Sequence, residues 1–383
     1  MFAMRGLRSQ SGFSLAELMV GLAIGLLATT IIIQVLSVFD AQRRSTTGSA
    51  DAQTNGALAL QSIVRDAQLA GYPLYPSADS PLECTSMTSV MPSGGVALSI
   101  NPVSLTNGTA GAGVAASDSI IIRYGDAPAG GGQTQIGGFV NSPSTTGASP
   151  TFSTVVNVGS SVGCSVSDVF MLNNGPTCAM GTISAKVVSP ASLTVQTSTS
   201  PSSMLPSNPV VVGANVACLG SWREITYAVD QTTLGREFTL TRTVTTNGAA
   251  GATTPILSGI VNIQAQYGVS ASTNSNQIAQ WVDATAGSPW AAPSTTDRKR
   301  IKALRVSVVA RNDTMEVNAQ TSSICSSYTT ANPTGLCAWE GTSGSPAPTI
   351  DLSPANANWG RYRYRVFDTI IPLRNVLWAK DTL

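Results

Sequence analysis

An uninterrupted apolar stretch lies close to the N-terminus of this chain and limits the structures that it can form. Residues 18–39 contain no charged side chain. As an α-helix they would extend for about 30 Å, which is the thickness of the hydrocarbon core of a bilayer. The stretch therefore predicts a helix that crosses a membrane. Two arginines precede it and two follow it closely, so the count of basic residues leaves its orientation open.

A cleaved secretory signal and an uncleaved anchor helix are the two ordinary explanations for such a stretch. It is longer than the apolar core of a typical signal peptide, and no small-x-small cleavage site follows it before Asp40. A simple anchor explains the length but not Glu17, because a carboxylate at the mouth of an apolar segment costs on the order of a kcal/mol or more. We therefore expect Glu17 to have a partner.

Around Glu17 the chain reads GFSLAELMV (residues 12–20), which resembles the leader junction of type IV prepilins and type II secretion pseudopilins. The resemblance implies that a prepilin peptidase cuts after Gly12, that Phe13 becomes N-methylated, and that the apolar stretch is retained. After cleavage Glu17 would lie one helical turn from the new amine of Phe13. Pairing of Glu17 with the Phe13 amine of a neighbouring subunit would set the register of a fibre, where an unpaired charge is costly.

Beyond the apolar stretch the chain has the pattern of an amphipathic helix, with apolar residues at spacings of three and four. Gly71 and Pro73 predict a helix end near Ala70, since glycine adopts the left-handed conformation and proline cannot continue a helix. The polar stretch 43–55 contains Gly48, so the two helical parts form either one continuous helix or a helix that kinks there. The apolar stripe comprises Ala57, Leu60, Ile63, Val64 and Ala67.

From residue 72 onward, short apolar or alternating runs are divided by Gly, Pro, Asn and Ser, which predicts a mostly antiparallel β-sheet head. The predicted fold class is therefore α+β, with a long N-terminal helix, half transmembrane and half amphipathic, attached to a large β-rich head. The expected division is a leader at 1–12, a helix at 13–71 with its membrane segment at about 18–39, and a head at 72–383 in one or two lobes.

Individual strands and loops of the head follow from the same patterns. Strands are expected at 119–124, 154–158, 168–172, 183–188, 256–266, 301–311 and 361–367, and a hairpin from 224–229 and 237–244. Long loops are expected at 125–138, 141–149 and 197–209, where the composition is of low complexity.

The six cysteines are even in number, scattered, and without the spacing of a metal site. In an exported chain they predict three disulfides. Six cysteines allow fifteen connectivities, so spacing alone does not decide the pairs. The pairs favoured by short loops are Cys164–Cys178 and Cys325–Cys337, which leaves Cys84–Cys218.

The composition argues against an enzyme. Histidine is absent, which removes the commonest general base and the commonest transition-metal ligand. Charged residues make up 11% of the chain, against about 25% in an average soluble domain, which suits an exported β-rich protein. The glycine runs at 130–132 and 137–138 lack the Lys-Ser/Thr of a phosphate loop. We expect no catalysis, no cofactor and no metal, and keep a processing or lytic enzyme as the remote alternative.

Short runs toward the C-terminus are similar to PilW-type minor pilins: YGV at 267–269, RKRIKALRV at 298–306, YRVF at 364–367 and IPLRN at 371–375. The resemblance implies a minor pilin that helps to initiate or cap a type IV pilus. It implies as partners other minor pilins, the major pilin, the prepilin peptidase and the inner-membrane assembly platform. It places the head in the periplasm, or on the pilus at the surface, of a Gram-negative bacterium. A type II secretion pseudopilin is the nearest alternative, followed by a pilus-tip adhesin or DNA-binding subunit.

Basic residues in the same region raise the question of a nucleic-acid partner. Arg361, Arg363 and Arg365 would share one face of a strand, near the basic run 298–302. The formal net charge is only +1, and no cluster of stacking aromatic residues accompanies these arginines. We therefore expect a solvated strand face, and DNA binding is the minor alternative.

Overall fold

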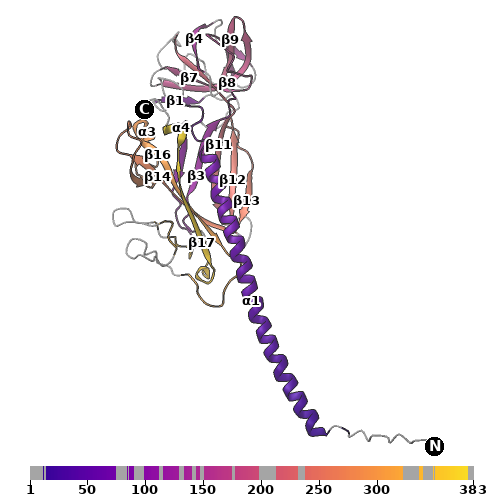
Figure 1. Cartoon of the computed structure of the whole chain (residues 1–383). Coiled ribbons are helices and arrows are strands. Elements are labelled where there is room, and N and C mark those ends of the chain that lie inside the picture. Colours follow the sequence, from indigo (N-terminus) through magenta and orange to yellow (C-terminus); the bar gives the residue numbers. More distant parts are fainter. Residues whose placement is uncertain are drawn as a thin grey trace, which may run out of the picture. The chain divides into compact units, whose positions relative to one another are not determined.

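A computed structural model describes the architecture of the chain (Figure 1). The described residues are 12, 14–74, 84, 86–89, 99–111, 115–128, 133–139, 144–146, 151–174, 177–197, 213–231, 238–321, 336–339, 348 and 350–377. The chain divides into two compact units, Met1–Ala50 and Asp51–Leu383.

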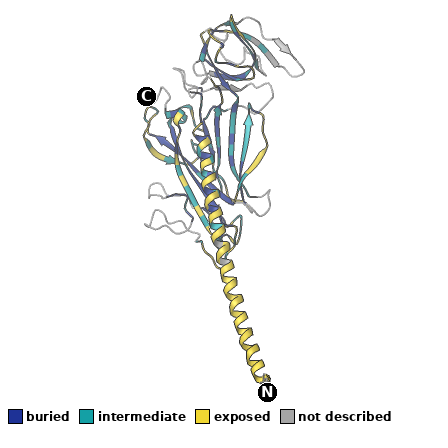
Figure 2. Ribbon diagram, turned by 45° about the vertical axis from the view of Figure 1, so that its right-hand side comes forward, coloured by how far each residue is buried: buried dark blue, intermediate teal, exposed yellow. Residues whose placement is uncertain are grey.

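Helix α1 (Leu15–Ala67) is continuous across Gly48. Residues 15–40 expose their side chains on every side (Figure 2). Apolar residues such as Ile32 and Phe39 are 57% and 63% exposed. By length and composition this helix can cross a membrane, where such a surface would face lipid and every backbone polar group is satisfied within the helix.

The last part of α1 is buried on one face against the sheets of the Asp51–Leu383 unit. Ala59, Ile63 and Ala67 are fully buried, whereas Ala57, which was expected on the apolar stripe, is exposed. Small residues set how closely the helix lies to the sheet, because a Cβ added at Gly56 would overlap the ring of Phe367. The helix ends at Ala67, slightly earlier than expected, and turns lead to Gly71 with the positive φ that its sequence position predicted.

Three sheets form the rest of this unit. The five-stranded sheet has the order β13 (Thr253–Ser258), β12 (Thr239–Thr246), β11 (Trp222–Asp230), β3 (Ser119–Gly125) and β2 (Val103–Thr106). The four-stranded sheet has the order β15 (Ile278–Val282), β14 (Ile260–Ser270), β16 (Ile301–Arg311) and β17 (Tyr364–Pro372). Both sheets are antiparallel throughout.

The third sheet has eight strands, among them the hairpin of β7 and β8. It contains β1 (Ser86–Ser89), β4 (Gln133–Phe139), β5 (Ser144–Thr146), β6 (Thr151–Val158), β7 (Val169–Asn174), β8 (Thr177–Val188), β9 (Ala191–Thr197) and β10 (Asn215–Gly220). All its pairings are antiparallel except β1 with β8. A long helix with a large, mostly antiparallel β-sheet region confirms the predicted α+β class.

The main core lies between α1 and the five- and four-stranded sheets. Ile63 from the helix, Tyr227 from β11 and Leu304 from β16 are buried together in it. Tyr267 links the two sheets, because its hydroxyl oxygen accepts a hydrogen bond from the Leu105 amide at 2.6 Å. The eight-stranded sheet has a separate core, which includes Phe170, Cys164 and Cys218. Cys84 and Cys178 lie in a further cluster with Trp222.

Most of the expected strands form. Those at 119–124, 154–158, 168–172, 183–188 and 301–311 correspond to β3, β6, β7, β8 and β16. The expected hairpin is β11 with β12, whose connecting residues 232–237 lie outside the described part of the chain. Three helices are short: α3 (Thr295–Arg300), η2 (Trp359–Arg361) and α4 (Arg374–Leu377).

Four of the expected ranges were wrong. The single strand expected at 256–266 is two strands, because Gly259 adopts a φ of +75° between β13 and β14. The strand expected at 361–367 begins only at Tyr364, because Arg361 closes the 3₁₀-helix η2. The expected loops at 125–138 and 141–149 contain β4 and β5. The loop expected at 197–209 lies outside the described residues beyond the end of β9.

The disulfide pairs of the eight-stranded sheet differ from the expectation. The bonds are Cys84–Cys178 and Cys164–Cys218, so the expected Cys164–Cys178 and Cys84–Cys218 pairs were wrong. Cys178 lies opposite Asn173, near the far end of β7, whereas Cys218, the partner of Cys164, lies opposite Phe170 near its start. Three residues of strand, roughly 10 Å, separate these two positions along β7.

Only one of the two cysteines of the third expected disulfide lies among the described residues. Cys337 is disulfide-bonded. Its expected partner, Cys325, lies outside the described residues. The pair therefore stays a prediction.

Asp118 makes the stability of this unit depend on pH. It is buried before β3, where its carboxylate accepts hydrogen bonds from the amides of Gly108 at 3.1 Å and Ala265 at 2.8 Å. Burial raises the pKa of Asp118 to about 6, from 3.8. A raised carboxyl pKa favours folding when protonated, so this contribution is complete below pH 3.8 and is lost as the pH rises through about 6. We expect a loss on the order of 3 kcal/mol across that window.

Urea unfolding of the detergent-solubilised chain between pH 4 and pH 7 measures this effect. The D118N variant is the control, since it cannot titrate at this position. The free energy of unfolding of the parent should fall relative to that of D118N as the pH rises. Parallel profiles for the two chains would show that Asp118 is not the titrating group.

Candidate processing and assembly site

The start of helix α1 is organised by Ser14 and Glu17. The Glu17 amide donates to the Ser14 hydroxyl oxygen at 3.2 Å, and the Ser14 amide donates to Glu17 Oε2 at 2.9 Å. This reciprocal arrangement is a capping box, which satisfies two of the backbone donors left free at a helix start. It also places a carboxylate at the positive end of the helix dipole.

Sequence reasoning missed this partner of Glu17. It considered only the Phe13 amine of a neighbouring subunit, although the Ser-x-x-Glu spacing immediately before an apolar run is the signal for a capping box. The bond to the Ser14 amide uses Oε2 alone. Within the described residues, Glu17 Oε1 accepts no hydrogen bond. Oε2 thus caps the start of the helix, and Oε1 is available to accept a hydrogen bond from a second group.

Gly12, the residue expected to precede the cleaved bond, is exposed. A Cβ added there would meet nothing within 4 Å, so the packing of this chain does not require glycine at position 12. Phe13 and residues 1–11 lie outside the described part of the chain.

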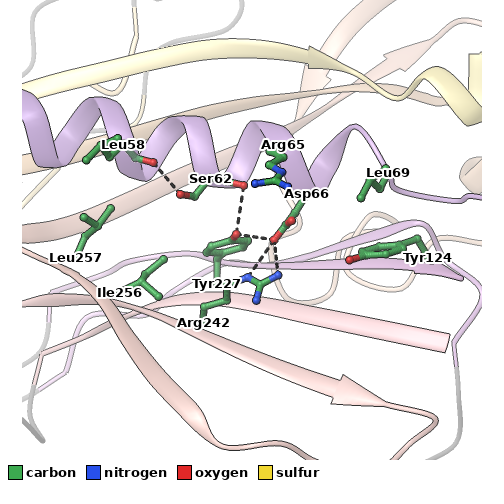
Figure 3. A pocket seen from close by; sticks show the side chains of 10 residues that line it. All are labelled: Leu58, Ser62, Arg65, Asp66, Leu69, Tyr124, Tyr227, Arg242, Ile256 and Leu257. Carbon is green, nitrogen blue, oxygen red and sulfur yellow. Dashed lines mark hydrogen bonds and ion pairs between the residues drawn. The ribbon is translucent and has the colours of Figure 1, made fainter. Parts of the chain in front are cut away.

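A second cluster of polar residues lies where α1 crosses the five-stranded sheet (Figure 3). Asp66 Oδ2 accepts a hydrogen bond from the Tyr227 hydroxyl at 2.6 Å and pairs with Arg242 Nη2 at 2.9 Å. Burial, with the Asp66 carboxylate beside it, raises the pKa of Tyr227 above its usual range. The pattern of α1 had placed Asp66 away from the apolar stripe, yet it is buried, because Arg242 and Tyr227 satisfy its charge.

The cluster forms one wall of a pocket of about 570 Å³ between α1 and the strands β11, β12 and β13, which we call the α1–β13 pocket. Leu58 and Ile256 lie at one end and Leu69 at the other, with the polar cluster between them (Figure 3). Asn55 holds the helix to β13 through a hydrogen bond from its side chain to the Ser258 carbonyl at 3.2 Å.

The basic residues considered for DNA do not form one surface. Arg361 belongs to η2 and donates to the Glu316 carbonyl at 2.8 Å, so it does not share a strand face with Arg363 and Arg365. Arg363 pairs with the Glu316 carboxylate at 2.9 Å.

The basic run 298–302 is likewise occupied by internal contacts. Arg298 donates to the Cys84 carbonyl at 2.8 Å, and Lys302 is buried with its ammonium near the Thr273 carbonyl at 3.3 Å. The guanidinium of Arg305, on β16, lies over the rings of Trp281 and Trp339, at 5.6 and 4.8 Å from their centres. These cations hold loops to the sheets. Among the described residues, no three His, Cys, Asp or Glu side chains come together as metal ligands would.

An exposed apolar helix preceded by a glycine junction and followed by a β-rich head is the arrangement of type IV prepilins. A family model described as Prokaryotic N-terminal methylation motif matches residues 7–33, and one described as Type IV Pilus-assembly protein W matches residues 226–375. No curated protein and no solved structure matches the chain. At its N-terminus the chain is therefore similar to type IV prepilins. Over residues 226–375 it is similar to the PilW type.

These matches also define its general role. A PilW-type prepilin-like protein is a structural subunit related to the type IV pilus, of a class that interacts with other pilins and with assembly machinery. Helix α1 anchors such a subunit in the membrane and associates it with the pilus.

Proposed function

We propose that this chain is a minor pilin that helps to initiate or cap the type IV pilus through contacts with other minor pilins and the major pilin. The observation that carries the proposal is the junction GFSLAELMV, with an exposed Gly12 directly before an exposed apolar helix, in a chain that matches pilus-assembly protein W. The large Asp51–Leu383 unit favours an end of the fibre, where a subunit need not fit a repeating lattice.

In this proposal a prepilin peptidase removes residues 1–12, and Phe13 becomes the methylated N-terminus. Glu17 then has two tasks. Oε2 keeps the first turn of the helix in place through the Ser14 amide. Oε1 pairs with the Phe13 amine of a neighbouring subunit, since a carboxylate in an apolar fibre core requires a positive partner. The chain enters the inner membrane with its head in the periplasm of a Gram-negative bacterium and is drawn into the fibre by the assembly platform.

The match to pilus-assembly protein W favours a pilus subunit over a type II secretion pseudopilin, because both share the N-terminal junction and differ in the head. DNA binding has less support than the sequence suggested, because the basic side chains of 298–302, Arg361 and Arg363 are engaged within the protein.

Intact-mass and N-terminal analysis of the chain from membranes and from sheared fibres tests the proposal. Both fractions should contain a chain that begins at methylated Phe13. A G12V variant should retain residues 1–12 and be lost from fibres, because the peptidase would no longer cut, while the head folds as before since Gly12 has no packing contact. G21V, also free of neighbours and inside the apolar stretch, is the control and should be processed normally. An unprocessed native chain in both fractions, or cleavage beyond Phe39, would refute the pilin role.

A further inference from the structure

The α1–β13 pocket contains one positive charge that no described residue neutralises with an ion pair. Of its charged residues, Arg242 is paired with Asp66. Arg65 also lines the pocket and is exposed, and it forms no ion pair within the described residues. The pocket therefore carries a net charge of about +1, and the complementary occupant has a carboxylate.

The ends of the same pocket are apolar. Leu58 and Leu69 are 44% and 42% exposed, although neighbouring residues of this part of α1 bury their apolar side chains against the sheets. Leu58 and Arg65, seven residues apart, lie on one side of α1, and Leu69 lies in the turn that follows the helix. Half-buried Ile256 and Leu257 face them from the edge strand β13. A complementary ligand therefore has apolar side chains on both sides of its carboxylate group.

The structure points to a peptide segment as the occupant. A groove bounded by a helix stripe and an edge strand, with a cation between two apolar ends, matches an acidic residue flanked by apolar ones. We propose that the α1–β13 pocket binds such a segment of a neighbouring pilus subunit, with its carboxylate on Arg65. This inference rests on the proposed function, and it identifies one surface through which the subunit contacts its neighbour.

Site-specific photo-crosslinking in the full-length chain, in cells that assemble fibres, tests the proposal. A photoreactive amino acid replaces Leu69, which lines the pocket, or Val317, which is 85% exposed and outside it. The Leu69 position should crosslink to a peptide of another pilus subunit that contains Asp or Glu beside an apolar residue, and the Val317 position should not. Mass spectrometry identifies the peptide.

Charge reversal then identifies the contact. R65E should lower the Leu69 crosslink at least fivefold without unfolding the chain, because Arg65 is exposed and has no ion pair to lose within the described residues. R374E, at an exposed arginine on α4, should leave the crosslink within twofold of the parent. Replacing the partner's acid with arginine should restore the crosslink to R65E.

The results separate this proposal from the proposed function. A chain that is cleaved after Gly12 and present in fibres, but whose Leu69 crosslink is absent, goes to lipid, or is unchanged by R65E, would overturn the pocket proposal alone. A chain that is neither cleaved nor present in fibres would overturn both. A crosslink that is lost in R65E and restored by the partner's reversed charge would establish the contact.

Discussion

Replacing both Cys164 and Cys218 with alanine is expected to lower the free energy of unfolding of the eight-stranded sheet by about 4 kcal/mol. The bond joins residues 54 apart in sequence, and a cross-link over a loop of that length restricts the unfolded chain by about this amount. Both cysteines are also buried in the core of that sheet, so the loss of sulfur packing adds to the effect. Urea unfolding of the oxidised, detergent-solubilised parent and double variant measures the difference.

Single variants test the pairing itself. In C164A, alkylation followed by mass spectrometry should find a free thiol at Cys218, with Cys178 still bonded to Cys84. The pairing expected from sequence would instead leave Cys178 free. A labelled Cys178 would thus show that the connectivity is the one expected from short loops.

Removing Arg242 is expected to destabilise the packing of α1 on the five-stranded sheet by about 3 kcal/mol. Its loss leaves the Asp66 carboxylate, whose side chain is 12% exposed, with the Tyr227 hydroxyl as its remaining side-chain partner. A buried charge that loses its partner typically costs about 3–5 kcal/mol. The lower end applies here, because the Arg242 side chain is itself 31% exposed. Urea unfolding of R242A, followed by tryptophan fluorescence, measures the loss.

R223A is the matched control, because Arg223 pairs with Asp126 in the same sheet but both side chains are more than a third exposed. Exposed ion pairs contribute at most about 1 kcal/mol, so R223A should change stability little. Adding D66N to R242A should recover part of the loss, since it removes the stranded charge. Equal losses in R242A and R223A would mean that burial of Asp66 carries no such cost.

The N-terminal part of the site could be predicted from sequence because its signals are local. A run without charges, a glycine before it and an acid at its start lie within thirty residues. No long-range contact is needed to read them. Even so, the capping box of Ser14 and Glu17 was missed, since Glu17 was interpreted only through a partner in another subunit.

The head was predictable only in outline. Alternating residues identified β16 and the β11–β12 hairpin correctly, because side chains that alternate between core and solvent leave a period of two. Strands of the eight-stranded sheet rich in Gly, Ser and Thr, such as β4 and β5, lack that contrast and were expected as loops. The break at Gly259 was missed because the sequence alone does not show that this glycine has a positive φ.

Local sequence was sufficient to predict the long apolar helix and the α+β class, both of which the structure confirms, and the cleavage site after Gly12, which stays a prediction. Tertiary structure alone decided the pairs Cys84–Cys178 and Cys164–Cys218, because strand order brings together sulfurs that are 94 and 54 residues apart. It also buried Asp66 against Arg242, which lies 176 residues away, and left Arg65, its neighbour in sequence, exposed in the α1–β13 pocket. Adjacent side chains of a helix point about 100° apart, so packing on the sheet buries one of them and leaves its neighbour exposed.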